Sequence, residues 1–258
     1  MKLVSPSPVQ QPWFVSISIV SHGHGAMVER LVTDLLNYPE VGQLIVTCNI
    51  PESLLLPKDT RIVLIDNPRP TGFGANHNAA SNQCNQPYFC LLNPDIQFEN
   101  NPFPMLLAAL EETGAAIAAP LVKNSLGEVA DSVRTFPSIR SLLLKVLSIT
   151  DGRYQVPDDS SIIFPEWVAG MFMLFSSDAF KQLLGFDERF FLYYEDVDIC
   201  TRAWKAGMKV IACPSVSVVH DARRDSHRHF RYMRWHLTSL MRYFFKHWGR
   251  LPRMPNLS

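Results

Sequence analysis

Short apolar segments alternate with segments of helical pattern along this 258-residue chain, and this alternation limits its fold more than any other feature. Strand-like runs bounded by turn-forming or polar residues lie at Trp13–Val20, Gln43–Cys48, Arg61–Ile65 and Tyr88–Leu92. We expect helices at residues 25–37, 75–83, 105–113 and 179–184. The alternation predicts an α/β domain with a mainly parallel central sheet flanked by helices. Because ligands of such sheets bind beyond the carboxyl ends of the strands, residues at strand ends are the candidates for function.

Size and apolar content fit one catalytic domain. With 47% apolar side chains, a chain of this length can bury a substantial core. We expect an N-terminal extension at residues 1–12, a catalytic domain at 13–222, and a basic amphipathic helix and tail at 223–258. Residues 121–165 lack a clear period and contain prolines. That stretch predicts a long mobile segment over the active face.

The N-terminus and the cysteines predict a cytoplasmic protein. Residues 1–12 carry one lysine and three prolines and lack the apolar run of a signal peptide. No apolar run approaches the roughly 20 residues of a membrane-spanning helix. The five cysteines are scattered and odd in number. They are therefore typical of free thiols in a reducing compartment and not of a zinc site or a disulfide framework.

Charges cancel over the whole chain but not along it. The 24 Lys and Arg residues balance 24 Asp and Glu residues, which argues against a nucleic-acid partner. From His220 onward, however, the chain contains nine Lys or Arg residues but only two acidic residues, Asp221 and Asp225. Apolar residues recur there at helical spacing: Phe230, Met233, Leu237, Leu240 or Met241, Phe244 and Trp248. The pattern predicts either a helix packed on the domain or an interfacial helix on an anionic inner-membrane surface.

The sequence Leu92-Asn93-Pro94-Asp95 places a carboxylate directly after an apolar strand. Pro94 restricts the backbone at this turn. A strand-end acid of this kind can coordinate Mg²⁺ or Mn²⁺, which prefer oxygen ligands and bridge to substrate phosphates. On spacing alone, a turn in which Asp95 caps the next element is an equal alternative.

Three acids, Glu195, Asp196 and Asp198, crowd the start of an expected helix. The helix dipole favours anions there, so simple capping explains them as one alternative. The aromatic residues just before them could also desolvate a carboxylate and raise its pKa, which suits a general base. Asp198 and Arg202 have the i,i+4 spacing of an ion pair on a helix surface.

Two further stretches contain candidate ligands. The apolar run Val216–Val219 ends in His220, whose imidazole could complete a metal site or serve as a structural hydrogen-bonding group. The small-residue loop at 72–78 runs into a helix, where backbone N–H groups can approach a diphosphate. That loop lacks the third glycine of a dinucleotide fingerprint, so a plain turn is its alternative.

In their order along the chain, these stretches resemble the inverting family 2 glycosyltransferases with a GT-A fold, especially the bacterial rhamnosyltransferase-like branch. The resemblance extends from about Val15 to His220. It rests on seven stretches: Val20-Ser21, 72–78, Leu92–Asp95, Arg134–Pro137, Trp167–Gly170, Phe186–Arg202 and Val219-His220.

The resemblance implies a role for each candidate residue. It implies that Asp196 is the catalytic base, that Asp95 is a metal ligand for Mg²⁺ or Mn²⁺, and that His220 lies near the metal and the diphosphate. Nucleotide-sugar binding is expected at Ser21, Asp66, Asn67, Gly72, His77, Asn78, Asn93, Trp167, Gly170, Glu195 and Arg202. Two departures from the family pattern matter. Asn93 stands where the metal motif has a second acid, and Cys48 stands where relatives have an Asp that holds the nucleobase.

The implied reaction moves a sugar, with dTDP-rhamnose as one donor, to a glycan or polyprenyl-linked acceptor in cell-surface polysaccharide synthesis. Its expected location is cytoplasmic or peripheral on the inner face of the bacterial plasma membrane, and a homodimer is compatible with the family. A nucleotidyltransferase is the competing enzyme class, but the loop at Ser21–Gly25 lacks the basic residues that it needs. A non-catalytic nucleotide-sugar-binding scaffold at the membrane surface is the alternative from another class.

Overall fold

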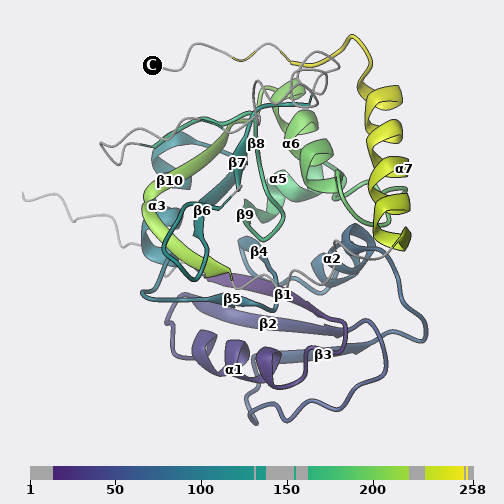
Figure 1. Ribbon diagram of the computed structural model, residues 1–258. Coiled ribbons are helices and arrows are strands. Elements are labelled where there is room, and N and C mark those ends of the chain that lie inside the picture. Colours follow the sequence, from purple (N-terminus) through teal and green to yellow (C-terminus); the bar gives the residue numbers. More distant parts are fainter. Residues whose placement is uncertain are drawn as a thin grey trace, which may run out of the picture.

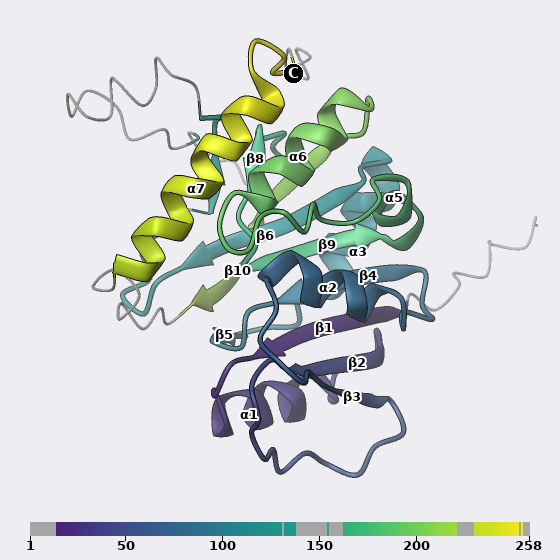
Figure 2. The same cartoon turned by 90° about the vertical axis from the view of Figure 1, so that its right-hand side faces the viewer.

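The computed structural model describes residues 14–130, 132–137, 154, 162–220, 230–252 and 254. Its main sheet has eight strands in the order β3-β2-β1-β4-β9-β6-β10-β5 (Figures 1 and 2). These strands are β1 (Val15–Ser21), β2 (Val41–Cys48), β3 (Ile62–Asp66), β4 (Tyr88–Leu92), β5 (Ile96–Gln97), β6 (Ile117–Lys123), β9 (Phe172–Ser176) and β10 (Val210–His220). A small second sheet pairs β7 (Val133–Arg134) with β8 (Trp167–Val168). The helices are α1 (Ala26–Leu35), α2 (Phe73–Ser81), α3 (Phe103–Thr113), α5 (Ser177–Gln182), α6 (Glu195–Lys205) and α7 (Phe230–His247).

The main sheet is buried on both faces, and each face has its own apolar core. Successive side chains of a strand point to opposite faces, so Cys90 and Leu92 of β4 join one core while Phe89 and Leu91 join the other. Helices α1 and α3 cover the first core. Helices α2, α5 and α6, with Tyr243 of α7, cover the second. This double coverage explains why the strands read as continuous apolar runs and not as alternating ones.

The expected α/β fold with a sheet flanked by helices is confirmed. Four of the seven strand pairings in the main sheet are parallel. The other three are antiparallel, because β9 runs between β4 and β6 in the reverse direction and β5 pairs back onto β10. Periodicity does not predict β6 and β9, since short and wholly apolar runs look alike in strands and in buried helices.

The remaining boundaries differ from expectation in detail. Helix α2 begins at Phe73, two residues before the expected start. The expected mobile segment at 121–165 is wrong at its two ends. Its first residues complete β6, while Ile163 pairs with Ala212 of β10. Trp13, Pro157, Asp158, Asp159, the basic residues 223, 224 and 228, and Arg253 lie outside the described residues.

Helix α7 stands at the outside of the molecule beside α6 (Figures 1 and 2). Three buried side chains on one face of it, Ser239, Tyr243 and His247, join it to the domain. Tyr243 shares a hydrogen bond of 3.0 Å with Thr201 of α6, and the His247 imidazole lies 2.8 Å from the buried Asp198 carboxylate. The expected packing of the C-terminal helix on the domain is therefore confirmed for this face. None of the described helices is both long enough and apolar enough to cross a bilayer.

Candidate active site

Asp95 and His220 meet at the carboxyl end of the sheet. The antiparallel pairing of β5 with β10 sets Ile96 opposite His220, so Asp95, the residue before Ile96, comes against the imidazole. Nε2 of His220 lies 3.0 Å from Oδ1 of Asp95, and both side chains are mostly buried. The sequence predicted these two residues separately from two strand ends, and the sheet brings them together.

The Asp95 carboxylate has an oxygen that the protein does not satisfy. Oδ1 is buried and accepts no hydrogen bond from the described residues, and its contact with His220 lacks hydrogen-bond geometry. A buried acceptor without a donor is costly unless a cation or a ligand meets it. A carboxylate oxygen beside an imidazole nitrogen suits a divalent cation. The described residues contain no set of three His, Cys, Asp or Glu side chains that could hold a metal alone. The pair therefore fits an ion that the substrate phosphates also coordinate.

A polar cavity of about 440 Å³ opens beside Asp95. Residues of α1 and of the segment after β4 line it, among them Arg30 and Gln97. The guanidinium of Arg30 is a donor set that suits phosphate oxygens. Sequence analysis missed Arg30, because a single arginine on a helix carries no pattern before the fold places it beside a strand end.

Asn93 connects the end of β4 to the residue that precedes β9. Its backbone N–H donates to the Met171 carbonyl at 2.9 Å, and its own carbonyl accepts from Ile96 at 3.2 Å. Gly170, the residue before Met171, donates its backbone N–H to Oδ2 of Asp196 at 3.0 Å. Consecutive residues of one backbone segment, Gly170 and Met171, thus bridge the Asp95 and Asp196 sides of the site.

Asp196 lies in the first turn of α6 and keeps part of its surface exposed. Burial raises the pKa of its carboxyl group, and hydrogen bonds from Gly170 and Val197 together with the charge of Arg134 oppose that rise. Oδ1 accepts the Val197 N–H at 2.8 Å. A carboxylate with both oxygens held and an elevated pKa has the properties of a positioned general base.

The turn before Asp196 is strained. Tyr193 and Tyr194 both have left-handed backbone conformations, with φ of 70° and 69°. Side chains other than glycine rarely adopt that region, and such strain gathers at functional sites. The start of α2 supports the turn from the other side, since the Phe73 N–H donates to the Phe191 carbonyl at 2.9 Å. A Cβ on Gly72 would lie 2.7 Å from that carbonyl oxygen, so this close approach requires glycine.

Glu195 points into the protein beside Asp196. Its side chain is buried, and its Oε2 has no hydrogen-bond partner among the described residues. Burial raises the pKa of Glu195 well above the usual range, and the neighbouring Asp196 charge adds to that effect. We therefore expect Glu195 to be neutral when Asp196 is ionised, which leaves Asp196 as the one base of the pair.

Two of the expected nucleotide-binding residues end strands, Ser21 at the end of β1 and Asp66 at the end of β3. Oγ of Ser21 accepts the His24 N–H, and the Glu52 carboxylate accepts the N–H groups of Gly23 and Gly25 at 3.2 Å each. These bonds order the loop after β1. Asp66 ends β3 with an exposed side chain, so its carboxylate is open to a ligand.

Asn67 joins the end of β3 to the first turn of α2. Its amide nitrogen donates to the Asn49 side chain at 3.0 Å and to the Asn76 side chain at 2.6 Å. Burial, followed by the charges of Glu52 and Asp66, raises the pKa of Cys48 to about 11. The thiol at this family position is therefore neutral and does not replace an aspartate as a charged group.

Three of the expected binding residues, His77, Asn78 and Arg202, have hydrogen-bond partners within the protein. His77 is fully buried, with Nδ1 2.8 Å from the Ser18 hydroxyl, and burial lowers its pKa to about 3. The Asn78 amide ties α2 to Phe186 through two hydrogen bonds of 2.9 and 2.8 Å.

Arg202 forms the expected pair with Asp198 at 2.8 Å and also donates to the carbonyls of Leu183 and Gly185. The pair is not on the helix surface as predicted, because Asp198 is completely buried. Since these bonds occupy the guanidinium, we leave Arg202 out of the site proposed below.

The small sheet of β7 and β8 brings Arg134 and Trp167 to the Asp196 side. The Arg134 guanidinium lies over the Trp167 ring at 5.7 Å, and the indole N–H donates to the Thr135 carbonyl at 2.9 Å. Since the Arg134 charge acts on both Asp196 and Tyr194, it belongs to the same site. The sequence placed Arg134 within the family resemblance without giving it a role.

Residues 49–175 match the family model described as glycosyl transferase family 2. The chain is 30% identical over 243 residues to rhamnosyltransferase WbbL of Escherichia coli strain K12. This alignment covers 89% of this chain and 92% of that protein. It is 34% identical over 145 residues to the N-acetylglucosaminyl-diphospho-decaprenol L-rhamnosyltransferase of Mycobacterium tuberculosis. That alignment covers 53% of this chain and 47% of the mycobacterial protein, so the match spans about half of each.

Among solved structures, the crystal structure of GalNAc-T7 with UDP, GalNAc and Mn²⁺ superposes with a TM-score of 0.69. It is 12% identical in sequence, and the superposition covers 93% of this chain and 49% of that one. This likeness confirms the GT-A fold. The chain belongs to the family 2 glycosyltransferases, and within them it resembles the rhamnosyltransferases.

Proposed function

We propose that this glycosyltransferase moves a hexose from a nucleoside diphosphate donor to a hydroxyl group of a glycan or polyprenyl-linked glycan, with inversion of the anomeric carbon. The observation that carries the proposal is the arrangement around Gly170 and Met171. One of these residues contacts the strand end that leads to Asp95, and the other holds the Asp196 carboxylate. The reaction needs a site for the leaving diphosphate and a base for the acceptor hydroxyl, and the two ends of this arrangement suit those tasks.

Asp95 and His220 would hold Mg²⁺ or Mn²⁺ together with the donor phosphates. When bound there, the ion would neutralise negative charge on the departing diphosphate. The unsatisfied Oδ1 of Asp95 and the nearby imidazole support this assignment. Arg30, in the cavity beside Asp95, would add a second positive charge for the phosphates.

Asp196 would accept the proton of the acceptor hydroxyl as that oxygen attacks the anomeric carbon. Its raised pKa keeps the carboxylate basic enough for this step, and the bonds from Gly170 and Val197 hold its orientation. Burial raises the pKa of the neighbouring Glu195 well above its usual range, which supports Asp196 as the single base of a site without a carboxylate nucleophile. Direct displacement by the acceptor inverts the anomeric centre.

The donor and the acceptor follow from the relatives. The Escherichia coli and mycobacterial proteins are both described as rhamnosyltransferases, which favours dTDP-rhamnose as the donor. The name of the mycobacterial relative includes a polyprenol-linked acceptor, N-acetylglucosaminyl-diphospho-decaprenol. We assign the chain to cell-surface polysaccharide synthesis at the inner face of the plasma membrane on this basis. Ser21, Asp66, Asn67 and Gly72 would line the nucleotide side, and Asn93, Trp167 and Gly170 the sugar side. A homodimer stays a prediction.

The test is an assay of purified protein with a panel of nucleotide sugars, Mg²⁺ or Mn²⁺, and a short polyprenyl-diphospho-N-acetylglucosamine acceptor. The proposal expects release of dTDP from dTDP-rhamnose that depends on the acceptor, and a product with inverted anomeric configuration by NMR. A nucleotidyltransferase would instead form a nucleotide sugar from a sugar phosphate, and a scaffold would bind donor without turnover. Either result, or a product with retained configuration, would overturn the proposal.

A further inference from the structure

Helix α7 presents a continuous apolar stripe to solvent on the face opposite its anchor. The stripe consists of Phe230, Met233, Leu237, Met241, Phe245 and Trp248 at the end of the helix. These side chains are 51–77% exposed. Successive members are three or four residues apart, which keeps them on one side of a helix. Phe245, and not the expected Phe244, is the exposed member near the end of the helix.

All the acidic or basic residues of α7 other than histidine are Lys or Arg, and Arg234 lies within the stripe, four residues after Phe230 and three before Leu237. Helix α7 contains Arg231, Arg234, Arg242 and Lys246 but no Asp or Glu. Lys246 turns inward, where its ammonium lies 2.6 Å from both Asp187 and Asp198. Arg231 and Arg242 are eleven residues apart, which is about three turns, so both flank the same side of the stripe.

These arginines are held near the ring faces of neighbouring aromatic residues. The guanidinium groups of Arg231 and Arg242 lie 4.7 and 5.9 Å from the ring centres of Trp235 and Phe190. Such contacts fix a guanidinium while leaving its edge N–H groups available to other acceptors.

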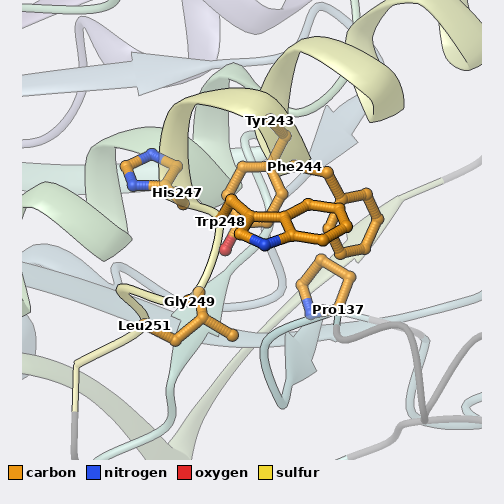
Figure 3. Close-up of a pocket in the computed structure, with 7 residues that line it drawn as sticks. All are labelled: Pro137, Tyr243, Phe244, His247, Trp248, Gly249 and Leu251. Atoms are coloured by element: carbon orange, nitrogen blue, oxygen red, sulfur yellow. The ribbon is translucent and has the colours of Figure 1, made fainter.

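The apolar surface continues beyond the end of the helix. A cavity of about 450 Å³ lies there, lined by Tyr243, Phe244, Trp248 and Leu251 together with Pro137, His247 and Gly249 (Figure 3). Trp248, the last member of the stripe, is also a wall of this cavity. The exposed apolar area is therefore larger than the helix alone offers.

We infer that the stripe of α7 docks into the interface of a membrane that contains anionic phospholipids. Apolar side chains on one face with arginines beside them match the acyl boundary and the negative headgroups of such a surface. A second copy of the chain is a poorer partner, because α7 has no acidic residue to face the arginines of another α7.

Docking of this kind would set the catalytic turn beside the bilayer. Ser239 of α7 donates to the Leu192 carbonyl at 2.9 Å, and the His236 ring lies 5.5 and 5.3 Å from the rings of Tyr193 and Tyr194. Leu192, Tyr193 and Tyr194 lie two to four residues before Asp196. This consequence rests on the proposed function, since a polyprenyl-linked acceptor would arrive from the membrane. The docking of α7 onto the membrane does not depend on the proposed function.

Vesicle flotation of the full chain tests the inference. Wild-type protein should float with phosphatidylglycerol-containing vesicles and far less with pure phosphatidylcholine vesicles, and added salt should weaken the binding. Leu237→Glu/Met241→Glu should lower the bound fraction at least tenfold. The control is Met105→Glu on α3, because Met105 and Met241 are similarly exposed, at 51% and 58%. It should bind like wild type.

Light scattering after size exclusion separates the alternatives. Equal flotation of the double variant and wild type, or no flotation of folded wild type, would overturn the inference. So would a wild-type dimer that becomes monomeric in the double variant while vesicle binding is unchanged. Neither measurement uses donor or acceptor, so a failure of the proposed reaction would leave both results readable.

Discussion

Nε2 of His220, at the end of β10, lies 3.0 Å from Oδ1 of Asp95, in the turn between β4 and β5. Two strand pairings create this contact. β10 pairs with β6 in parallel along one edge, and the last two residues of β10 pair with the short antiparallel β5 along the other edge. The contact joins an oxygen without a hydrogen-bond donor to a nitrogen that can bind a metal. Whether these two side chains hold a metal ion can be tested by measuring metal-dependent nucleotide binding, without an activity assay.

Asp95→Asn should weaken Mn²⁺-dependent binding of dTDP about tenfold or more, because it removes the anionic ligand of the ion. His220→Gln should also weaken it. If both side chains hold one ion, the double variant should lose less than the sum of the two losses, as coupled residues do. Isothermal titration calorimetry measures these affinities. Strictly additive losses, or unchanged affinity in Asp95→Asn, would contradict a shared site.

Asp196→Asn should lower kcat by roughly 10²- to 10⁴-fold, the usual effect of losing a positioned base. The amide keeps the size of the side chain and can still occupy its place beside Gly170. Affinity for dTDP should therefore change little. Steady-state kinetics and calorimetry on the same preparation check both parts. Turnover near the wild-type rate would remove Asp196 from the mechanism, and Asp178→Asn on α5 is the exposed control.

The pH profile of kcat/KM should show an acid limb set by Asp196. Transfer needs the ionised carboxylate, so activity should fall as the pH drops through a pKa that burial has raised above the ordinary 3.8. The charge of Arg134 opposes that rise. Arg134→Gln should consequently move the limb to higher pH, whereas Lys181→Gln, an exposed cation on α5, should not. A limb that moves to lower pH in Arg134→Gln would contradict the electrostatic assignment.

His77 should make the protein less stable in acid. Its folded-state pKa is lowered by burial from 6.5 to about 3, so the unfolded chain binds a proton in this range while the folded chain does not. The stability is present above pH 6.5 and is lost as the pH falls from there toward about 3. Urea unfolding across this window measures the slope. In His77→Gln the slope should become shallower, while replacing the exposed His22 by Asn should leave it unchanged.

Asp198→Asn should destabilise the fold by about 3 kcal/mol, a usual cost of breaking a buried ion pair. Burial alone would raise the pKa of Asp198, but the bond from His247 and the charges of Arg202 and Lys246 outweigh it and lower that pKa. The completely buried carboxylate thus connects α6 to α7. Urea denaturation of this variant beside Asp178→Asn gives the difference. A cost as small as that of the exposed control would mean that Asp198 contributes little to holding α7.

Local patterns predict the parts of the fold whose sequence differs clearly from its surroundings. The four N-terminal strands and the first turn of α6 belong to this group, because turn residues or acids mark where they begin and end. Strands β6 and β9 escape prediction, since each is an apolar run whose partner is decided by the sheet. The inward direction of Asp198 also escapes, because i,i+4 spacing gives the partner but not the face that is buried.

The candidate site divides in the same way. Strand ends and a helix start direct attention to Asp95, His220 and the acids at 195–198, because such positions face the ligand side of an α/β sheet, but only the family resemblance selects Asp196 as the expected base. The structural roles of His77 and Arg202 cannot, since each depends on which neighbours the fold supplies. Arg30 and Arg134 gain significance only after folding places them near Asp95 and Asp196.

The position of β9 affects how the protein can be made. β9 (Phe172–Ser176) lies between β4 and β6, both of which leave the ribosome much earlier. Until residue 176 has been synthesised, the edges of β4 and β6 that β9 will cover have no native partner. Unpaired strand edges readily join other chains, so the nascent protein is exposed to aggregation from the completion of β4 at residue 92 until residue 176 has been made. The sheet is completed only when β10 (Val210–His220) follows, and slower elongation between residues 92 and 172 would lengthen the exposure of the edges that β9 covers.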